Sequence, residues 1–192
     1  MNFAGTGAGG GTGNLQSTGQ WAVAHQAFTV TTTTTQPVSI IIGLNDDLTG
    51  LEKHEKRMQR PPRISKRFTL NKKGSIGQNH TYMVPYGGLI YASTAEDNIT
   101  LTLSNTIKAP WYKLSQDGTE KWINPIDSPA PLGEIESKTF IYTSAKKNLQ
   151  ATNYSDVKKF AEELDTFSSD LNDFYARDED SSGSLNLSLI HI

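Results

Sequence analysis

The chain has 192 residues, with 18 Lys and Arg against 20 Asp and Glu, so its formal charge of −2 gives no indication of nucleic-acid binding. No stretch approaches the roughly 18 to 20 continuous apolar residues of a membrane-spanning helix. Cysteine is absent, which excludes disulfides, cysteine-based zinc sites and thiol nucleophiles.

The N-terminal residues 1–14 are rich in glycine and predict a flexible linker, because they have almost no side chains to bury. They show neither the cationic start nor the apolar segment of a signal peptide. Their formal GxGxxG match lacks the preceding strand and following helix that a dinucleotide site requires.

From Trp21 onward the pattern is typical of β-structure. Short β-branched and aromatic runs alternate with turn residues, and in 98–103 the residues Ile99, Leu101 and Leu103 alternate with threonines, so we expect them to face a core. The pattern predicts an antiparallel β-sandwich over 15–145. The expected strands include 28–30, 38–42, 67–70, 81–84, 88–91, 98–103 and 139–142.

The periodicity changes to 3.6 residues in 155–175, which predicts one long amphipathic α-helix within a helical segment 146–180. Asp156 in the first turn suits the positive end of the helix dipole. Such a helix needs a surface to cover. If a following lobe is absent, we expect a partly exposed apolar stripe of Phe160, Leu164, Phe167 and Phe174.

No residue pattern supports chemistry in this chain. His54-Glu55 resembles the start of HExxH, but Met58 stands where the second histidine would be, and the remaining histidines show no ligand spacing. The basic run 53–67 has the composition of a solvated loop, with anion docking as the alternative. We therefore assign no catalytic and no metal-ligating residue.

Three tryptophans, Trp21, Trp111 and Trp122, are candidates for contacting a glycan, because aromatic rings bury the apolar faces of sugars; core or edge packing is the alternative. Two further segments are expected to fix the path of the backbone rather than to take part in chemistry. Arg60-Pro61-Pro62 predicts an extended segment, and Pro85-Tyr86-Gly87-Gly88 predicts a tight turn that feeds a strand.

Several segments in order and register resemble the enhancin-like, mucin-degrading zinc metallopeptidases, and among them the accessory colonisation factor lipoproteins of Gram-negative bacteria. The resemblance runs from about residue 15 to about residue 180. The segments are 16–24, 43–50, 60–63, 84–91, 109–111, 128–134, 140–143, 163–167 and 172–175.

The resemblance implies a β-sandwich lobe beside a helical peptidase lobe that carries HExxH and binds zinc. It also implies a secreted or surface-anchored parent that cleaves mucin-type glycoproteins. None of the family's catalytic residues has a counterpart in this sequence. We expect a non-catalytic N-terminal portion that needs no cofactor of its own, with the missing helical lobe as a partner.

The last residues depart from the family pattern. Residues 181–192 are expected to be a non-native tail, and 187–192 resemble the translation of a sequencing-library adapter. Two alternatives to the peptidase interpretation stay open. One is a β-sandwich module that binds glycan or surface protein, as in an adhesin or colonisation factor, and the other is a purely structural adhesin domain.

Overall fold

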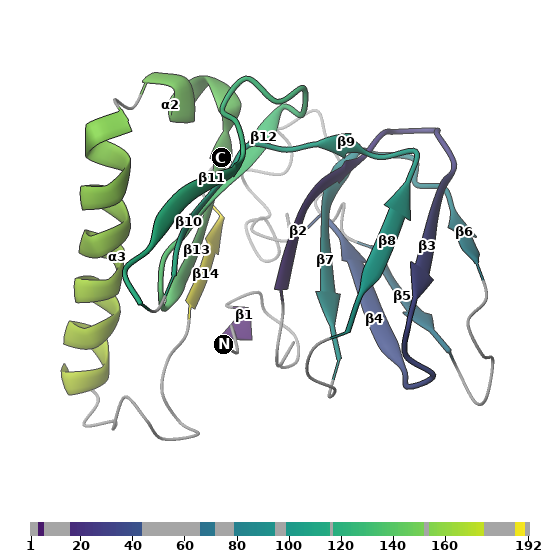
Figure 1. Ribbon diagram of the computed structural model, residues 1–192, viewed down its shortest axis with the longest axis horizontal. Helices are drawn as coiled ribbons and strands as arrows, with labels where there is room; N and C mark the ends of the chain where they lie inside the picture. The colour runs from purple at the N-terminus through teal and green to yellow at the C-terminus, as the bar shows by residue number, and fades with distance from the viewer. Residues whose placement is uncertain are drawn as a thin grey trace, which may run out of the picture. The chain divides into compact units, whose positions relative to one another are not determined.

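The computed structural model describes residues 4–5, 16–43, 66–71, 79–94, 99–115, 117–151, 154–174 and 187–190. Arg60, Pro61, Pro62, His54 and most of the predicted linker and tail lie outside these residues. The chain forms two compact units, one built from residues 15–107 and one from residues 108–192, which also takes in Ala4–Gly5. Figure 1 shows their elements.

The N-terminal unit contains a five-stranded and a three-stranded sheet, in the orders β5-β4-β7-β2-β9 and β6-β3-β8. The strand pairs β2/β7, β4/β5, β4/β7, β3/β6 and β3/β8 are antiparallel. The strands are β2 (Gln16–Ala22), β3 (Phe28–Thr32), β4 (Val38–Ile42), β5 (Lys66–Leu70), β6 (His80–Tyr82), β7 (Gly88–Ser93), β8 (Leu101–Ser104) and β9 (Ile107–Lys108).

One apolar core joins the two sheets of this unit. Phe28 and Val30 of β3 belong to the same buried cluster as Ile40 and Ile42 of β4, which lies in the other sheet. Ile99, Leu101 and Leu103 pack against this cluster as expected, while the threonines between them are exposed. The sheets therefore pack face to face, which confirms the predicted sandwich for this part of the chain.

The C-terminal unit has a mixed six-stranded sheet in the order β1-β14-β13-β12-β10-β11. The pairs β10/β12 and β13/β14 are parallel, whereas β10/β11 and β12/β13 are antiparallel. The strands are β1 (Ala4–Gly5), β10 (Trp111–Leu114), β11 (Glu120–Asn124), β12 (Leu132–Glu136), β13 (Phe140–Ala145) and β14 (Leu187–Ile190).

Two helices pack on this sheet, α2 (Lys146–Ala151) and α3 (Tyr154–Phe174). Val157 and Ala161 of α3 and Leu149 of α2 share a buried cluster with Tyr112, Leu114 and Ile135 of the strands. The long helix is confirmed nearly to its predicted ends. The short α2 lies at the start of the predicted helical segment 146–180, but its six residues are too few for a visible helical period that would mark it as a separate helix.

The face of α3 that is buried changes along its length. Val157 and Ala161 are buried in the first half, and Ser168 and Asn172 in the second, whereas Phe167 is 53% exposed and Phe174 is 81% exposed. The expected apolar stripe is thus partly exposed. Among the described residues, no helix is apolar enough over a sufficient length to span a bilayer.

Candidate functional site

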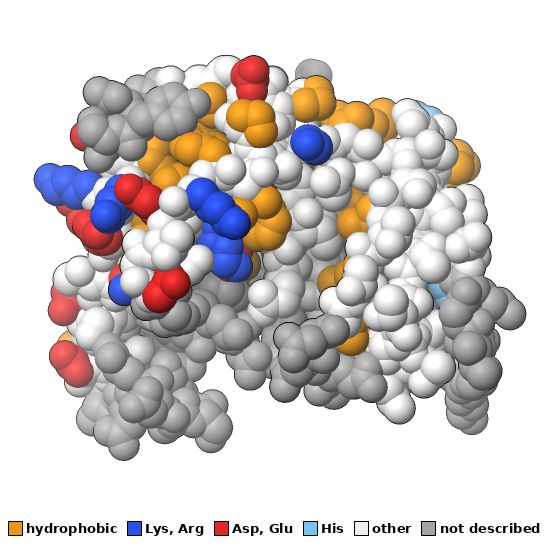
Figure 2. Space-filling model, in the orientation of Figure 1, with side chains coloured by type: hydrophobic (Ala, Val, Ile, Leu, Met, Phe, Trp, Pro, Cys, Tyr) orange, Lys and Arg blue, Asp and Glu red, His pale blue; other side chains and the backbone are white. Residues whose placement is uncertain are grey.

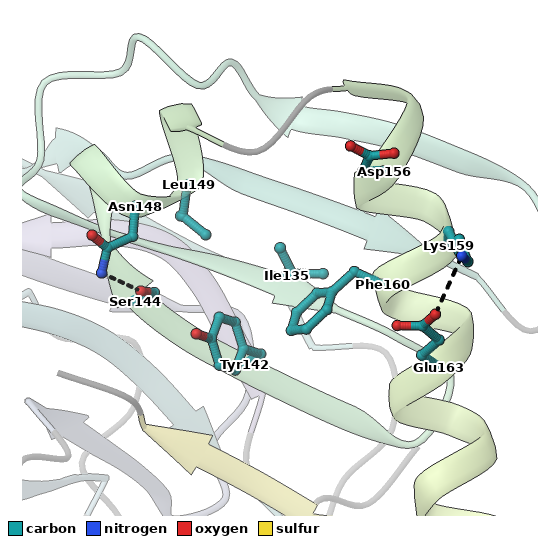
Figure 3. A pocket seen from close by; sticks show the side chains of 9 residues that line it. All are labelled: Ile135, Tyr142, Ser144, Asn148, Leu149, Asp156, Lys159, Phe160 and Glu163. Atoms are coloured by element: carbon teal, nitrogen blue, oxygen red, sulfur yellow. Dashed lines mark hydrogen bonds and ion pairs between the residues drawn. The ribbon is translucent and has the colours of Figure 1, made fainter.

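A cavity of about 430 Å³ lies in the C-terminal unit between the sheet and both helices (Figure 3). Its lining comes from four elements that follow one another closely in the chain, so the turn from β13 into α2 and α3 builds it. The lining residues are Ile135, Tyr142, Ser144, Asn148, Leu149, Asp156, Lys159, Phe160 and Glu163.

The floor of the cavity is apolar and well packed. Ile135 and Leu149 are 1% and 3% exposed. The rings of Tyr142 and Phe160 meet edge to face, with centroids 5.0 Å apart and planes inclined at 75°, an arrangement that aromatic pairs favour. A Cβ on Gly133 would lie 2.7 Å from Pro110 Cβ and 2.8 Å from both Pro110 O and Leu149 Cδ1, so glycine is needed where β12 passes close to the Pro110 backbone.

The rim of the cavity is polar. Lys159 Nζ lies 3.7 Å from Glu163 Oε1 across one helical turn, and Asp156 stands one turn earlier on α3. Asn148 on α2 is exposed, and its Nδ2 donates at 3.4 Å to Oγ of the fully buried Ser144. The two carboxylates and one ammonium give the rim a formal charge of −1.

Asp165 anchors α3 to the turn between β12 and β13. Its Oδ1 accepts hydrogen bonds from Ser137 Oγ at 2.6 Å and from Thr139 N and Oγ1 at 2.9 and 2.8 Å, and its Oδ2 accepts from Lys138 N at 3.2 Å. These bonds fix the helix against the sheet, and thereby hold the walls of the cavity.

Two carboxylates on the strands are also hydrogen-bonded. Glu136 accepts from Lys113 Nζ at 2.6 Å and from Trp111 Nε1 at 3.0 Å, and the ammonium lies 5.6 Å from the centroid of the indole ring. Tyr112 donates its hydroxyl to Glu120, to which Lys158 of α3 also lies close. Burial first, and then the Glu120 carboxylate, raise the pKa of Tyr112 above its ordinary value.

Each candidate tryptophan has a packing partner. Trp21 lies against Gly87, where an added Cβ would be 2.8 Å from the indole. Trp122 meets Tyr112 edge to face at 5.6 Å and packs on the helix side of the sheet, whereas Trp111 is bonded to Glu136 on the other side of β10. Trp111 and Trp122 therefore do not form one stacking surface, and glycan contact at each of the three stays a prediction.

The predicted tight turn of residues 85–88 lies between β6 and β7, and its last residue, Gly88, begins β7. Pro85 and Tyr86 are exposed, and Gly88 is buried so closely against Gly43 that an added Cβ would lie 2.8 Å from the Gly43 nitrogen. Both glycines of this turn therefore stand where neighbouring atoms leave no room for a side chain.

Charge is unevenly distributed on the visible face. In Figure 2, acidic and basic side chains gather over the elements of the C-terminal unit, while the strands of the N-terminal unit present mainly uncharged surface. On this face, the unit that holds the cavity is therefore the one over which the charged side chains gather.

Two family matches divide the sequence near the boundary of the units. Residues 5–108 match the N-terminal domain of M60-like peptidases, and residues 105–191 match peptidase M60, enhancin and enhancin-like. The chain belongs to the M60-like, enhancin-like peptidase family. The resemblance inferred from the sequence motifs is confirmed.

Curated relatives of this M60-like chain include two bacterial proteins. It is 52% identical over 177 residues to the accessory colonization factor AcfD of Vibrio cholerae, a match that covers 91% of this chain. It is 46% identical over 172 residues, 88% of this chain, to a putative lipoprotein AcfD homolog of Escherichia coli. The chain spans 11% of the length of each of these relatives.

Solved M60 structures share the fold. The ZmpB metallopeptidase from Clostridium perfringens superposes with a TM-score of 0.63 at 13% identity, covering 93% of this chain and 40% of the other. The M60 catalytic domain of ZmpC from the same organism, in complex with the sialyl T antigen, gives a TM-score of 0.62 at 14% identity, covering 92% of this chain and 38% of the other.

The M60 metallopeptidase family implies a metal, usually zinc, in the parent protein. The residues of this chain do not fit one, because the sequence has no HExxH and no cysteine. Within the described ranges there is also no group of three or more His, Cys, Asp and Glu residues placed to hold a metal ion. No catalytic step is therefore derived from these residues.

The cavity was not predicted from the sequence. Phe160 was recognised as part of the helical stripe and Tyr142 as part of a strand, but no pattern indicates that their rings meet. Asn148 and Leu149 lie on α2, which is too short for its periodicity to indicate which of its residues face inward. Only the path of the chain from β13 through α2 into α3 brings these residues together.

Proposed function

We propose that this chain is the N-terminal portion of a zinc metallopeptidase that is secreted or held at the surface of a Gram-negative bacterium and cleaves mucin-type glycoproteins. The chain itself is non-catalytic in this proposal. The observation that carries it is the pair of family matches over residues 5–108 and 105–191, together with 52% identity to a colonization factor.

The substrate class is supported by structures of the same fold. Solved structures of this fold include a complex with an O-glycopeptide and a complex with the sialyl T antigen. A surface location is supported by the name of the Escherichia coli relative, a putative lipoprotein. Mucin-type glycoproteins are therefore the proposed partners of the parent.

The role proposed for this chain is to support a helical peptidase lobe. Phe167 and Phe174 expose apolar surface on α3. Burying such surface against another part of the protein is favourable. The lobe that carries HExxH is proposed to cover these two rings, with the Asp165 bonds holding α3 in place beneath it.

The decisive experiment compares two polypeptides on the same O-glycosylated mucin. We expect no cleavage by purified residues 1–192, with or without added zinc, and chelator-sensitive cleavage by a polypeptide extended through the HExxH segment. Zinc-dependent cleavage by residues 1–192 alone would contradict the non-catalytic assignment. An extended gene without an HExxH segment would contradict the peptidase assignment of the parent.

A sandwich module that binds glycan or surface protein is the second candidate. The observation in its favour is the exposure of apolar side chains on the N-terminal unit, with Met83 at 62% and Tyr86 at 47% in the segment that packs against Trp21. Calorimetric titration with mucin O-glycans tests it. Binding that is lost in Trp21→Ala favours the module, and absence of binding at millimolar glycan excludes it.

A further inference from the structure

We propose that the cavity lined by β12, β13, α2 and α3 binds a single neutral sugar unit, a hexose or an N-acetylhexosamine. The proposal rests on the proposed function only for the source of the sugar, which is the O-glycan of a mucin-type substrate. Binding at this site requires no cleavage, so it can be measured on this chain directly.

The size of the cavity favours a small and compact ligand. Ligand pockets typically measure about 300–1,000 Å³, and the volume here, about 430 Å³, lies near the lower end of that range. One sugar ring with its substituents fits such a space. A longer glycan would have to extend out of the cavity into solvent.

The lining matches the two faces of a sugar ring. A pyranose has an apolar face of C–H groups, which aromatic rings bury well, and a hydroxylated edge that must keep its hydrogen bonds. The apolar part of the lining offers the rings of Tyr142 and Phe160 together with the buried side chains of Ile135 and Leu149. A wholly apolar ligand would displace water from the polar rim and would not replace the hydrogen bonds that the water made.

The rim supplies both donors and acceptors. The Asn148 amide can donate and accept, the carboxylates of Asp156 and Glu163 accept, and the Lys159 ammonium donates. Sugar hydroxyls also donate and accept, so a mixed rim suits them. Hydrogen bonds to charged groups are also stronger than those between neutral groups.

The charge of the rim selects a neutral sugar over an acidic one. Asp156 and Glu163 outnumber Lys159, whose ammonium already lies 3.7 Å from Glu163. A carboxylate or sulfate on the ligand would face net repulsion, and like charges brought together across an interface are unfavourable. Galactose and N-acetylgalactosamine are therefore expected to bind, and sialic acid is not.

The test is saturation-transfer NMR on the purified 192-residue chain with N-acetylgalactosamine, galactose and sialic acid as separate probes. We expect saturation transfer to the neutral sugars with a Kd of about 1 mM, as expected for a ligand of about 15 non-hydrogen atoms. Transfer to sialic acid should be at least about tenfold weaker, because of the acidic rim.

Two variants one residue apart locate the site. Glu163→Gln removes a charged acceptor from the rim and should weaken binding at least about fivefold, whereas Glu162→Gln makes the same substitution at a neighbour that does not line the cavity and should change nothing. Phe160→Leu, checked for folding by circular dichroism, should also weaken binding because it removes a ring from the floor.

Three results would each overturn the proposal. One is absence of saturation transfer from both neutral sugars at about 50 mM, a concentration well above the expected Kd. The second is binding of sialic acid as strong as that of galactose. The third is equal binding by the Glu163→Gln and Glu162→Gln variants. None of these results bears on whether the extended parent cleaves mucin.

Discussion

Asp165 accepts hydrogen bonds from both the backbone N–H and the hydroxyl of Thr139, at 2.9 and 2.8 Å, although the two residues belong to different elements. Asp165 lies mid-helix on α3, and Thr139 lies in the turn that leads into β13. The Asp165 carboxylate thus joins the helix to the turn before β13, and close by the half-exposed ring of Phe167 lies 6.4 Å from that of Phe140 of β13.

Replacing this carboxylate should destabilise the C-terminal unit. Asp165→Ala leaves the turn donors of residues 137–139 without their acceptor, and we expect a loss of about 2–4 kcal/mol in the free energy of unfolding. Urea unfolding measures it. Asp170→Ala, at an exposed position of the same helix, should stay within about 0.5 kcal/mol of wild type. Equal stability of the two variants would contradict the assigned role.

The ion pair between Lys113 and Glu136 should matter more than the exposed pair on α3. The Glu136 side chain is 5% exposed and the Lys113 side chain 33%, against 76% and 63% for Lys159 and Glu163. We expect Glu136→Gln to lower the free energy of unfolding by about 1–3 kcal/mol, because it leaves a charge poorly compensated. The same substitution at Glu163 should cost less than about 0.5 kcal/mol. Thermal unfolding of both variants checks the order.

Stability should fall in alkaline solution because of Tyr112. Its pKa is raised by burial and by Glu120, so the unfolded chain loses the phenolic proton at a lower pH than the folded chain does. The stabilisation that Tyr112 gives the folded chain is fully present below pH 10.0, the ordinary pKa of tyrosine, and is lost progressively as the pH rises above it.

A spectrophotometric titration at alkaline pH should find a tyrosine that ionises later than the exposed ones, and Tyr112→Phe should remove it. Tyr82 also has a pKa raised by burial, so Tyr82→Phe serves as the control that identifies the second late signal. If the Tyr112→Phe variant keeps every late-ionising tyrosine signal, the assignment is contradicted.

The turn before β7 should not tolerate a side chain at Gly87. In Gly87→Ala the new Cβ would lie 2.8 Å from the indole of Trp21, and we expect a loss of about 1–3 kcal/mol from the strain. The effect should shrink in a Trp21→Leu background, where the clashing ring is gone. A double-mutant cycle measures this coupling, and additive effects would show that the indole is not the cause.

The exposed rings of α3 should promote self-association of the chain. Phe174 is 81% exposed, so Phe174→Ser should change the free energy of unfolding by no more than about 0.5 kcal/mol while reducing association. Light scattering at rising protein concentration checks it. The matched substitution Phe140→Ser, at a buried ring, should instead destabilise the fold. Association unchanged by Phe174→Ser would argue against an apolar docking surface.

Local patterns predicted much of the secondary structure. The alternation at Ile99, Leu101 and Leu103 and the helical period of 155–175 both identified elements that the structure contains, because each reflects a repeating burial within one element. The period includes Val157 and Ala161, which are buried, but it does not identify the inward positions of the second half of α3, where Ser168 and Asn172 are buried and Phe174 is exposed. The partner of a helix face is set by another part of the chain.

The sequence by itself determined the mainly β class, the long helix and the family, because these depend on residue periodicity and on motifs that keep their order along the chain. Tertiary structure alone decided that residues from 108 onward form their own mixed sheet with α2 and α3. It also decided that Trp111 and Trp122 lie on opposite faces of the sheet, and that the rings of Tyr142 and Phe160 meet in the lining of a cavity. The physical reason is that strand pairing and ring contacts join residues distant in sequence, and no local pattern records such partners.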